Sequence, residues 1–183
     1  MSGQPEWRRA YLGLGSNLGE RLENLRYAVD ALASDPAIRL RDVSAVYETE
    51  PVGPVPQPDY LNAVAVVDTC FSPHALLEFC LQIEERRGRV RGERWGPRTL
   101  DVDILVVEGV VLHAESLVLP HPELRRRRFV LRPLADVAPD LIVEPFGKPV
   151  RELLENCPDD KAVQPYGPAE LLQIARVGSY QLL

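Results

Sequence analysis

Residues 89–107 read RVRGERWGPRTLDVDILVV and carry the clearest structural and chemical information in the chain. The first ten of these residues hold four arginines and a tryptophan among glycines and a proline, which is typical of a loop. Asp101 and Asp103 follow, and they open an apolar run from Ile104 to Val107 that is typical of a strand. The sequence therefore predicts an arginine-rich loop that leads into a strand with two carboxylates at its start.

The segments before this strand alternate between strand and helix patterns. Strands are predicted at residues 8–14, 38–47 and 60–68, and a proline-rich loop at residues 48–58 precedes the third. One helix is marked by helical spacing of Leu22, Leu25, Val29 and Leu32, and another follows the N-cap Ser72 and runs from Pro73 to about Arg87. The order β-α-β-β-α-β predicts an α+β fold, a ferredoxin-like αβα sandwich with a mostly antiparallel sheet.

Shorter elements are expected after residue 107. We predict a strand at residues 110–112, a short helix or turn at residues 121–127, and one or two short helices within residues 132–156. Residues 1–158 are expected to form a single domain, and residues 159–183 a C-terminal extension that packs on it or trails from it.

Composition narrows the class of protein. The 183 residues are 45% hydrophobic and 26% charged, as in an ordinary globular domain, and no apolar run approaches the roughly 20 residues of a membrane span. Three cysteines form no CxxC pair, which favours a reducing cytoplasmic setting. The net charge of −6 argues against general affinity for nucleic acid, although the arginines cluster at residues 86–98 and 125–128.

The two aspartates are the first candidate site. Side chains at i and i+2 of a strand lie on one face, roughly 6–7 Å apart. Leu105 and Val107 are expected to continue the face of the aspartates, with Val102, Ile104 and Val106 on the other. Two carboxylates at this spacing suit Mg²⁺, which binds one or two carboxylates together with substrate phosphates. The alternative is a strand-end pair held by a salt bridge to Arg98.

The arginine-rich loop is the second candidate site. Guanidinium groups bind phosphate oxygens in a bidentate manner, and the glycines would let the loop close over a polyphosphate. The alternative is a disordered basic loop. Trp95 is placed to cover a flat ligand. Glu84 lies beside the apolar stripe of its helix, where it either accepts a hydrogen bond from a ligand or pairs with an arginine.

With these motifs assembled, the chain resembles the 6-hydroxymethyl-7,8-dihydropterin pyrophosphokinase family over about residues 8–150. The residues that carry the resemblance are GSNL at 15–18, QPDYLNA at 57–63, GRVR at 88–91, RWGPRTLDVD at 94–103, Pro120–His121, Arg127 and Phe129. The resemblance implies the αβα sandwich and transfer of pyrophosphate from ATP to the pterin hydroxymethyl group, with release of AMP. It also implies Mg²⁺, as two ions held by Asp101 and Asp103.

The resemblance assigns further roles by motif. Arg89, Arg91 and Arg98 would be catalytic. The ATP site would contain Glu84, Arg91, Arg94, Trp95, Arg98, Ile104, His121 and Arg127. The pterin site would contain Thr49, Val52, Tyr60, Asn62, Trp95, Asp101, Arg127 and Phe129. The chain departs from the family pattern in a loop that is one residue short between Arg91 and Glu93, and at Leu81, Ser116, Val118 and Pro122.

The expected partners are the small molecules ATP and 6-hydroxymethyl-7,8-dihydropterin, with no nucleic acid and no membrane, and the protein is expected to be a monomer. Two other classes of function remain open. An RNA-binding module would use the arginine clusters on the sheet, but the RNP1 pattern is missing from the sequence. A metal-dependent nucleotidyltransferase or nuclease would use the same aspartates and release pyrophosphate or cleave nucleic acid.

Overall fold

The computed structural model describes residues 6–88 and 96–173 of the chain. A six-stranded sheet forms its centre, with the order β10-β3-β4-β1-β5 and with β2 also paired to β4. Every pairing in this sheet is antiparallel, as predicted. The elements in chain order are β1 (Arg8–Ser16), α1 (Arg21–Ser34), β2 (Ile38–Val43), β3 (Val46–Thr49), β4 (Tyr60–Thr69), α2 (Pro73–Arg86), β5 (Asp101–Val107), β6 (Leu112–His113), β7 (Val118–Leu119), η1 (Leu124–Arg126), α3 (Arg128–Val137), β8 (Ile142–Val143), β9 (Lys148–Pro149), α4 (Val150–Glu155), β10 (Val163–Gly167) and η2 (Ala169–Leu171).

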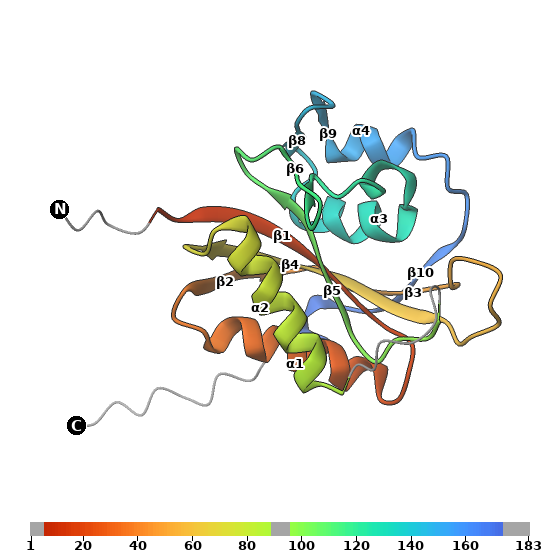
Figure 1. Ribbon diagram of the computed structural model, residues 1–183. Helices are drawn as coiled ribbons and strands as arrows, with labels where there is room; N and C mark the ends of the chain where they lie inside the picture. Colours follow the sequence, from red (N-terminus) through yellow and green to blue (C-terminus); the bar gives the residue numbers. More distant parts are fainter. Residues whose placement is uncertain (1–5, 89–95, 174–183) are drawn as a thin grey trace, which may run out of the picture.

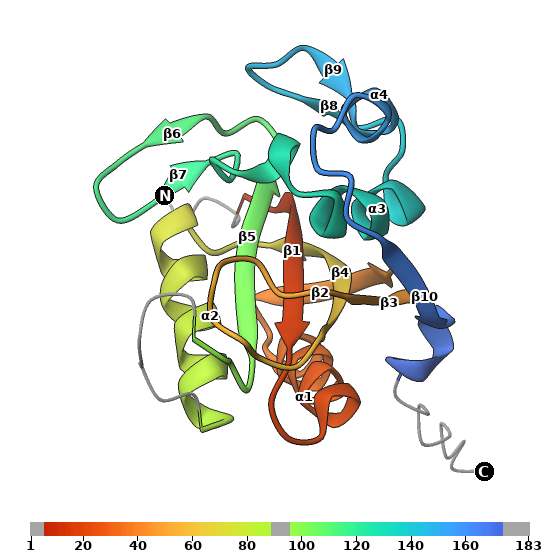
Figure 2. The same cartoon turned by 90° about the vertical axis from the view of Figure 1, so that its right-hand side faces the viewer.

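The helices cover the sheet from both sides, which gives the predicted αβα sandwich. Helices α1 and α2 pack on one face, and α3 lies on the other with α4 beside it (Figures 1 and 2). Two separate groups of buried side chains fill the spaces. Leu12, Leu25 and Ile83 belong to the group under α1 and α2, whereas Leu105 and Leu131 belong to the group under α3 and α4. Strand residues alternate between the two groups because successive side chains point to opposite faces.

Three details of the predicted strands were wrong. The strand expected at residues 110–112 begins only at Leu112, since β6 spans Leu112–His113. Residues 38–47 are not one strand, because the strand is interrupted at Ser44. The Ser44 backbone N–H donates to the Val64 carbonyl of β4, and the Ser44 hydroxyl accepts from the Val64 N–H, each at 2.8 Å. The expected alternation along β5 also fails past Ile104. Tyr11 pairs with Val106 but Leu12 pairs with Ile104, so an extra residue bulges out of β5.

The bulge exchanges the faces of two valines. Leu105 lies on the face of the aspartates, as predicted, but Val106 joins it in the core under α3. Val107 instead packs in the core under α1 and α2 with Ile104. A single inserted residue has this effect because the strand repeat is two residues.

The extension after residue 158 contributes a strand to the main sheet. Strand β10 pairs with β3, with Val163 opposite Thr49 and Pro165 opposite Tyr47. It thereby covers the edge that β3 would otherwise present. Within the described residues, no helix has the length and apolar character needed to cross a membrane.

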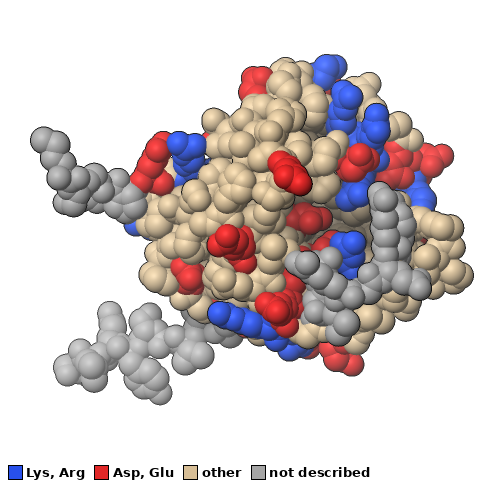
Figure 3. Space-filling view, in the orientation of Figure 1, with Lys and Arg blue, Asp and Glu red and all other residues tan. Residues whose placement is uncertain are grey.

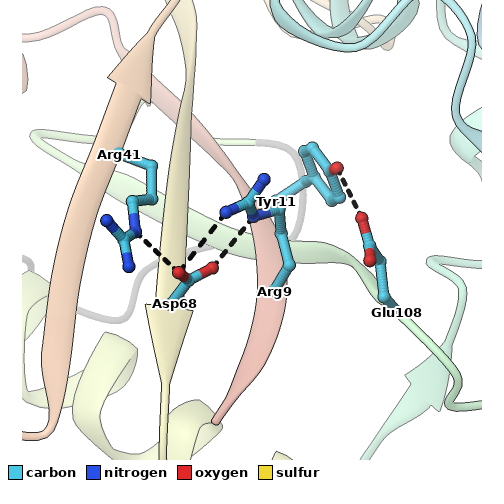
Figure 4. Close-up of polar contacts among 5 residues, drawn as sticks. All are labelled: Arg9, Tyr11, Arg41, Asp68 and Glu108. Carbon is cyan, nitrogen blue, oxygen red and sulfur yellow. Dashed lines mark hydrogen bonds and ion pairs between the residues drawn. The ribbon is translucent and has the colours of Figure 1, made fainter.

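Ion pairs link the strands at the end of the sheet where β1 begins. Asp68 of β4 accepts from Arg9 of β1 at 2.9 Å and from Arg41 of β2 at 2.6 Å, and Tyr11 donates to Glu108 at 2.8 Å (Figure 4). Hydrogen bonds from Arg9, with further support from Arg41, lower the pKa of Asp68 below its usual value. The Asp68 contacts join β1, β4 and β2, and the candidate site lies at the opposite end of β1 and β4.

Candidate active site

A pocket opens on the face of the sheet that carries α3, near the end of β1 and the starts of β4 and β5. Figure 3 shows a hollow on this side of the molecule, in which acidic and basic atoms lie close together. Its floor comes from β1, β4 and β5, and its walls come from the segment after β3 and from the start of α3. The lining includes Gly13, Gly15, Thr49, Glu50, Val52, Gln57, Tyr60, Asn62, Gly96, Arg98, Asp101, Asp103, Leu105, Arg127, Phe129 and Val130.

The floor is open because β1 presents glycines where the neighbouring strands present polar side chains. Gly15 pairs with Asn62 of β4 on one side and with Asp101 of β5 on the other. A Cβ atom at Gly15 would lie 3.1 Å from Asn62 Oδ1. At Gly13 a Cβ atom would meet the side chain of Leu105 at 3.2 Å. The glycines therefore leave room for a ligand between the carboxylates and the amide.

The part of the pocket around Asn62 suits a flat polar ring. Asn62 is buried, and its amide donates to the Thr49 hydroxyl at 2.5 Å, which fixes the orientation of the amide. Tyr60, Val52 and Phe129 supply aromatic and apolar walls. A planar heterocycle could stack on such walls and form hydrogen bonds at its edge with the amide.

The other part of the pocket holds the two carboxylates. Asp101 Oδ1 forms a 2.9 Å ion pair with Arg98 Nη1, the contact expected if the aspartates are structural. Asp103 keeps some surface open to the pocket but is otherwise enclosed by protein. This burial, together with the charges of Asp101 and Glu84, raises the pKa of Asp103 to about 7. An additional positive charge would relieve the repulsion between these groups.

The aspartate pair is the candidate metal site. Among residues 6–88 and 96–173, no cluster of three or more His, Cys, Asp or Glu side chains could hold a metal ion. A cation at Asp101 and Asp103 would therefore take its remaining ligands from water or substrate oxygens, as Mg²⁺ commonly does.

Asn17 organises the edge of the pocket, and it was not predicted as a site residue. Its side-chain amide donates to Gln57 Oε1 and to the Pro58 carbonyl, both at 2.9 Å, while its Oδ1 accepts from the Arg98 backbone N–H at 2.7 Å. One buried residue thus connects the loop before β4 with the segment before β5. Asn17 belongs to the GSNL motif and Gln57 to the QPDYLNA motif, but the spacing of the two motifs does not show that these side chains meet.

Most of the predicted site residues that can be described lie together in this pocket. They are Thr49, Val52, Tyr60, Asn62, Arg98, Asp101, Asp103, Arg127 and Phe129. Arg89, Arg91, Arg94 and Trp95 lie outside the described residues, as does the shortened link between Arg91 and Glu93.

Three predicted ATP-site residues do not line the pocket. Glu84 is buried beneath β5 and accepts from the backbone N–H of Val102 at 2.7 Å, a partner that the sequence did not suggest. Ile104 packs in the core under α1 and α2. His121 follows a cis Leu119–Pro120 bond, and its Nδ1 accepts from the Glu123 N–H at 3.1 Å. Burial, and then the charge of Arg127, lower the pKa of His121, which favours a neutral imidazole.

Comparisons with known proteins identify the family of the chain. The profile of a family described as 7,8-dihydro-6-hydroxymethylpterin-pyrophosphokinase matches residues 11–139. A 2-amino-4-hydroxy-6-hydroxymethyldihydropteridine pyrophosphokinase of Methylorubrum extorquens is 52% identical over 80% of this chain and 91% of its own length. The enzyme of the same name from Pseudomonas aeruginosa is 47% identical over 82% of this chain and 93% of its own.

The fold of this chain resembles that of a solved structure. The chain matches a crystal structure of Plasmodium falciparum HPPK-DHPS with pteroate, with a TM-score of 0.64 and 16% identity. The match covers 85% of this chain but 43% of the Plasmodium chain, so this chain spans less than half of that protein. Since the profile matches well over half of the sequence and the relatives are matched along most of their length, the chain belongs to the 7,8-dihydro-6-hydroxymethylpterin-pyrophosphokinase family.

Proposed function

We propose that the pocket at the ends of β1, β4 and β5 transfers pyrophosphate from ATP to 6-hydroxymethyl-7,8-dihydropterin. The hydroxymethyl oxygen would bond to the β-phosphorus of ATP as the α–β bridging oxygen leaves with AMP, and the hydroxyl would lose its proton. One observation carries the proposal: the recess around Asn62 of β4 adjoins the carboxylates of Asp101 and Asp103 on β5, across the glycines of β1 that lie between the two strands. The family membership supports the same reaction.

The carboxylates Asp101 and Asp103 would hold Mg²⁺, in two ions, together with the phosphates of ATP. When bound, Mg²⁺ neutralises charge on the phosphates and orients them for in-line displacement. The donor set fits, because two carboxylates at the base of an open pocket leave ligand positions for phosphate oxygens. Arg98, which pairs with Asp101 in this structure, would then become available to a phosphate.

The pterin would lie between Asn62 and the start of α3. The amide of Asn62 would bind the polar edge of the ring, and Tyr60, Val52 and Phe129 would contact its faces and sides. Thr49 would act mainly by holding the Asn62 amide. Arg127, also at the pocket, would contact the pterin or the transferred phosphates.

The remaining assignments follow from the family motifs. Arg89, Arg91 and Arg94 would bind the phosphates, with Arg91 facing the charge that develops during transfer. Trp95 would cover the pterin, while Glu84, Ile104 and His121 would support the ATP site. We further propose that the enzyme acts as a cytoplasmic monomer.

A product assay tests this proposal. Purified protein is incubated with ATP, Mg²⁺ and the reduced pterin, and AMP and pterin diphosphate are quantified by chromatography. We expect equal amounts of the two products, and no product without the pterin or with EDTA. Asp103→Ala should reduce turnover by at least about 1,000-fold, because positioning and charge neutralisation account for most of the catalysis. Absence of AMP at micromolar enzyme would refute the proposed reaction.

A further inference from the structure

Residues 158–173, called here the C-terminal strap, run from α4 past the start of α3 and along β3 (Figure 2). They include β10 and η2. The strap lies beyond residues 11–139, the part of the chain that matches the family profile. Its contacts nevertheless converge on the wall of the pocket.

Asp159 connects the strap to the start of α3. Its Oδ2 accepts from the backbone N–H of Arg128 at 3.0 Å, and its Oδ1 accepts from the backbone N–H of Lys161 at 3.1 Å. Arg128 is the first residue of α3, and the N-cap residue Arg127 provides no side-chain cap. Because the first N–H groups of a helix lack partners within the helix, a carboxylate there is favourable. Asp159 thus caps α3 between two pocket residues, Arg127 and Phe129.

The next residues of the strap reach the opposite wall of the pocket. Lys161 Nζ donates to the Pro51 carbonyl at 3.2 Å, and Pro51 lies between the pocket residues Glu50 and Val52. Val163 then pairs with Thr49, which orients Asn62. The contacts of Asp159, Lys161 and Val163 therefore reach both sides of the recess around Asn62.

The far end of the strap is also anchored. Arg26 of α1 donates to the Leu171 carbonyl at 2.6 Å, and Leu172 is fully buried with the core under α1 and α2. The strap is therefore held at both ends. A second cavity, lined in part by Asp159 and Lys161, shares Val52 and Arg127 with the pocket, so the strap lies directly behind the pocket wall.

We propose that Asp159 is a positioning residue for pterin binding, because it fixes the start of α3 relative to the segment after β3. It acts through Arg128 and Lys161 rather than by touching the substrate. The inference rests on the proposed function, since it takes this pocket to be the pterin site. The proposal gives the C-terminal strap, which lies outside the residues that the family profile matches, a role in the reaction.

The test compares Asp159→Ala and Asp159→Asn with Asp160→Ala. Asp160 is exposed and adjacent, so its replacement gives the same change of charge. Asparagine at 159 keeps one accepting oxygen but places an amide N–H against the other backbone N–H, so it should have an intermediate effect. For Asp159→Ala we expect the KM for pterin to rise about fivefold, because this change is equivalent in free energy to the loss of a helix cap. We expect kcat to stay within about twofold of the wild-type value. Asp160→Ala should leave both constants unchanged.

Hydrogen exchange of the full-length proteins without ligand gives a second reading. In Asp159→Ala, the amides of Glu50, Val52 and Gly53 and those of residues 128–130 should exchange faster than in the wild type, whereas those of β1 and α1 should not. Equal pterin KM values in Asp159→Ala and Asp160→Ala, or unchanged exchange at both walls, would overturn the positioning role. If the wild type forms no AMP, the proposed function fails, while the exchange data still decide whether Asp159 holds the two walls.

Discussion

At the residue scale, the ionised carboxylate of Asp103 lowers the stability of the ligand-free fold. Its pKa is raised to about 7 by burial and by the neighbouring carboxylates, whereas a free aspartate titrates near 3.9. A carboxyl whose pKa is raised on folding costs stability as pH rises from the unfolded value towards the folded one. This cost is present in full above about pH 7, where the site is expected to bind Mg²⁺.

Asp103→Asn should therefore stabilise the ligand-free protein while removing activity. We expect the free energy of unfolding to increase by roughly 2 kcal/mol at pH 8, because the amide is neutral at any pH. The gain should diminish as the pH is lowered towards 4. Urea unfolding at pH 5 and pH 8, without metal, measures both values. A variant that is less stable than the wild type at pH 8 would contradict this electrostatic interpretation.

Gly15 provides a second prediction at this scale. In Gly15→Ala, the new methyl group would lie 3.1 Å from Asn62 Oδ1, whose amide is already held by Thr49. We expect the KM for pterin to rise about tenfold, with unfolding free energy changed by less than about 1 kcal/mol. Gly13→Ala is the comparison, because its methyl group meets the Leu105 side chain, which can rotate. A KM for pterin in Gly15→Ala equal to that of the wild type would show that space at Gly15 is not needed.

Individual site residues could be predicted from the sequence where they belong to a motif whose side chains suit a particular ligand. Asp101 and Asp103 were identified because strand alternation places them on one face and their carboxylates suit a metal, whereas Asn62 was identified through the family motif. Asn17 was not identified, since its partners are 40 and 81 residues away in the chain. The partner of Glu84 was equally hidden, because a backbone N–H carries no mark in the sequence.

At the scale of elements, the Asp68 ion pairs join β4 to the strands on both sides. Arg9 and Arg41 reach the same carboxylate from β1 and β2, and they lower the pKa of Asp68 (Figure 4). A carboxyl whose pKa is depressed on folding contributes stability above its unfolded pKa. That contribution is lost as the pH falls through the folded pKa.

Asp68→Asn should lower the free energy of unfolding by about 1 kcal/mol at pH 7, since each partly exposed pair contributes up to about that amount. The difference from the wild type should disappear as the pH falls below the usual aspartate range. Asp30→Asn, an exposed site on α1, serves as the control for charge. Urea unfolding at pH 7 and in acid measures the effect. A difference that persists unchanged in acid would exclude the ion pairs as its cause.

Element order was predictable because local periodicity marks most of these strands and helices, including β5 at residues 101–107. Irregularities were not. The interruption at Ser44 and the bulge after Ile104 depend on pairing with β4 and β1, and pairing between distant strands is not encoded in a local pattern.

At the scale of the whole molecule, the antiparallel sheet explains why the site has one location. Strands β1, β4 and β5 pair so that the end of β1 meets the starts of its two neighbours. The glycines, the amide and the carboxylates are thereby brought to one end of one face, and α3 closes that face (Figure 1). The sequence predicted this sandwich, but it did not predict that β10 completes the sheet beyond β3.

The fate of the β-phosphorus tests the central claim most directly. ATP labelled at that atom is incubated with the reduced pterin, Mg²⁺ and the full-length protein, and the products are separated. Attack at the β-phosphorus predicts that the label appears in pterin diphosphate, with unlabelled AMP as the other product. Label recovered in ADP, with a pterin monophosphate beside it, would contradict pyrophosphoryl transfer at this pocket.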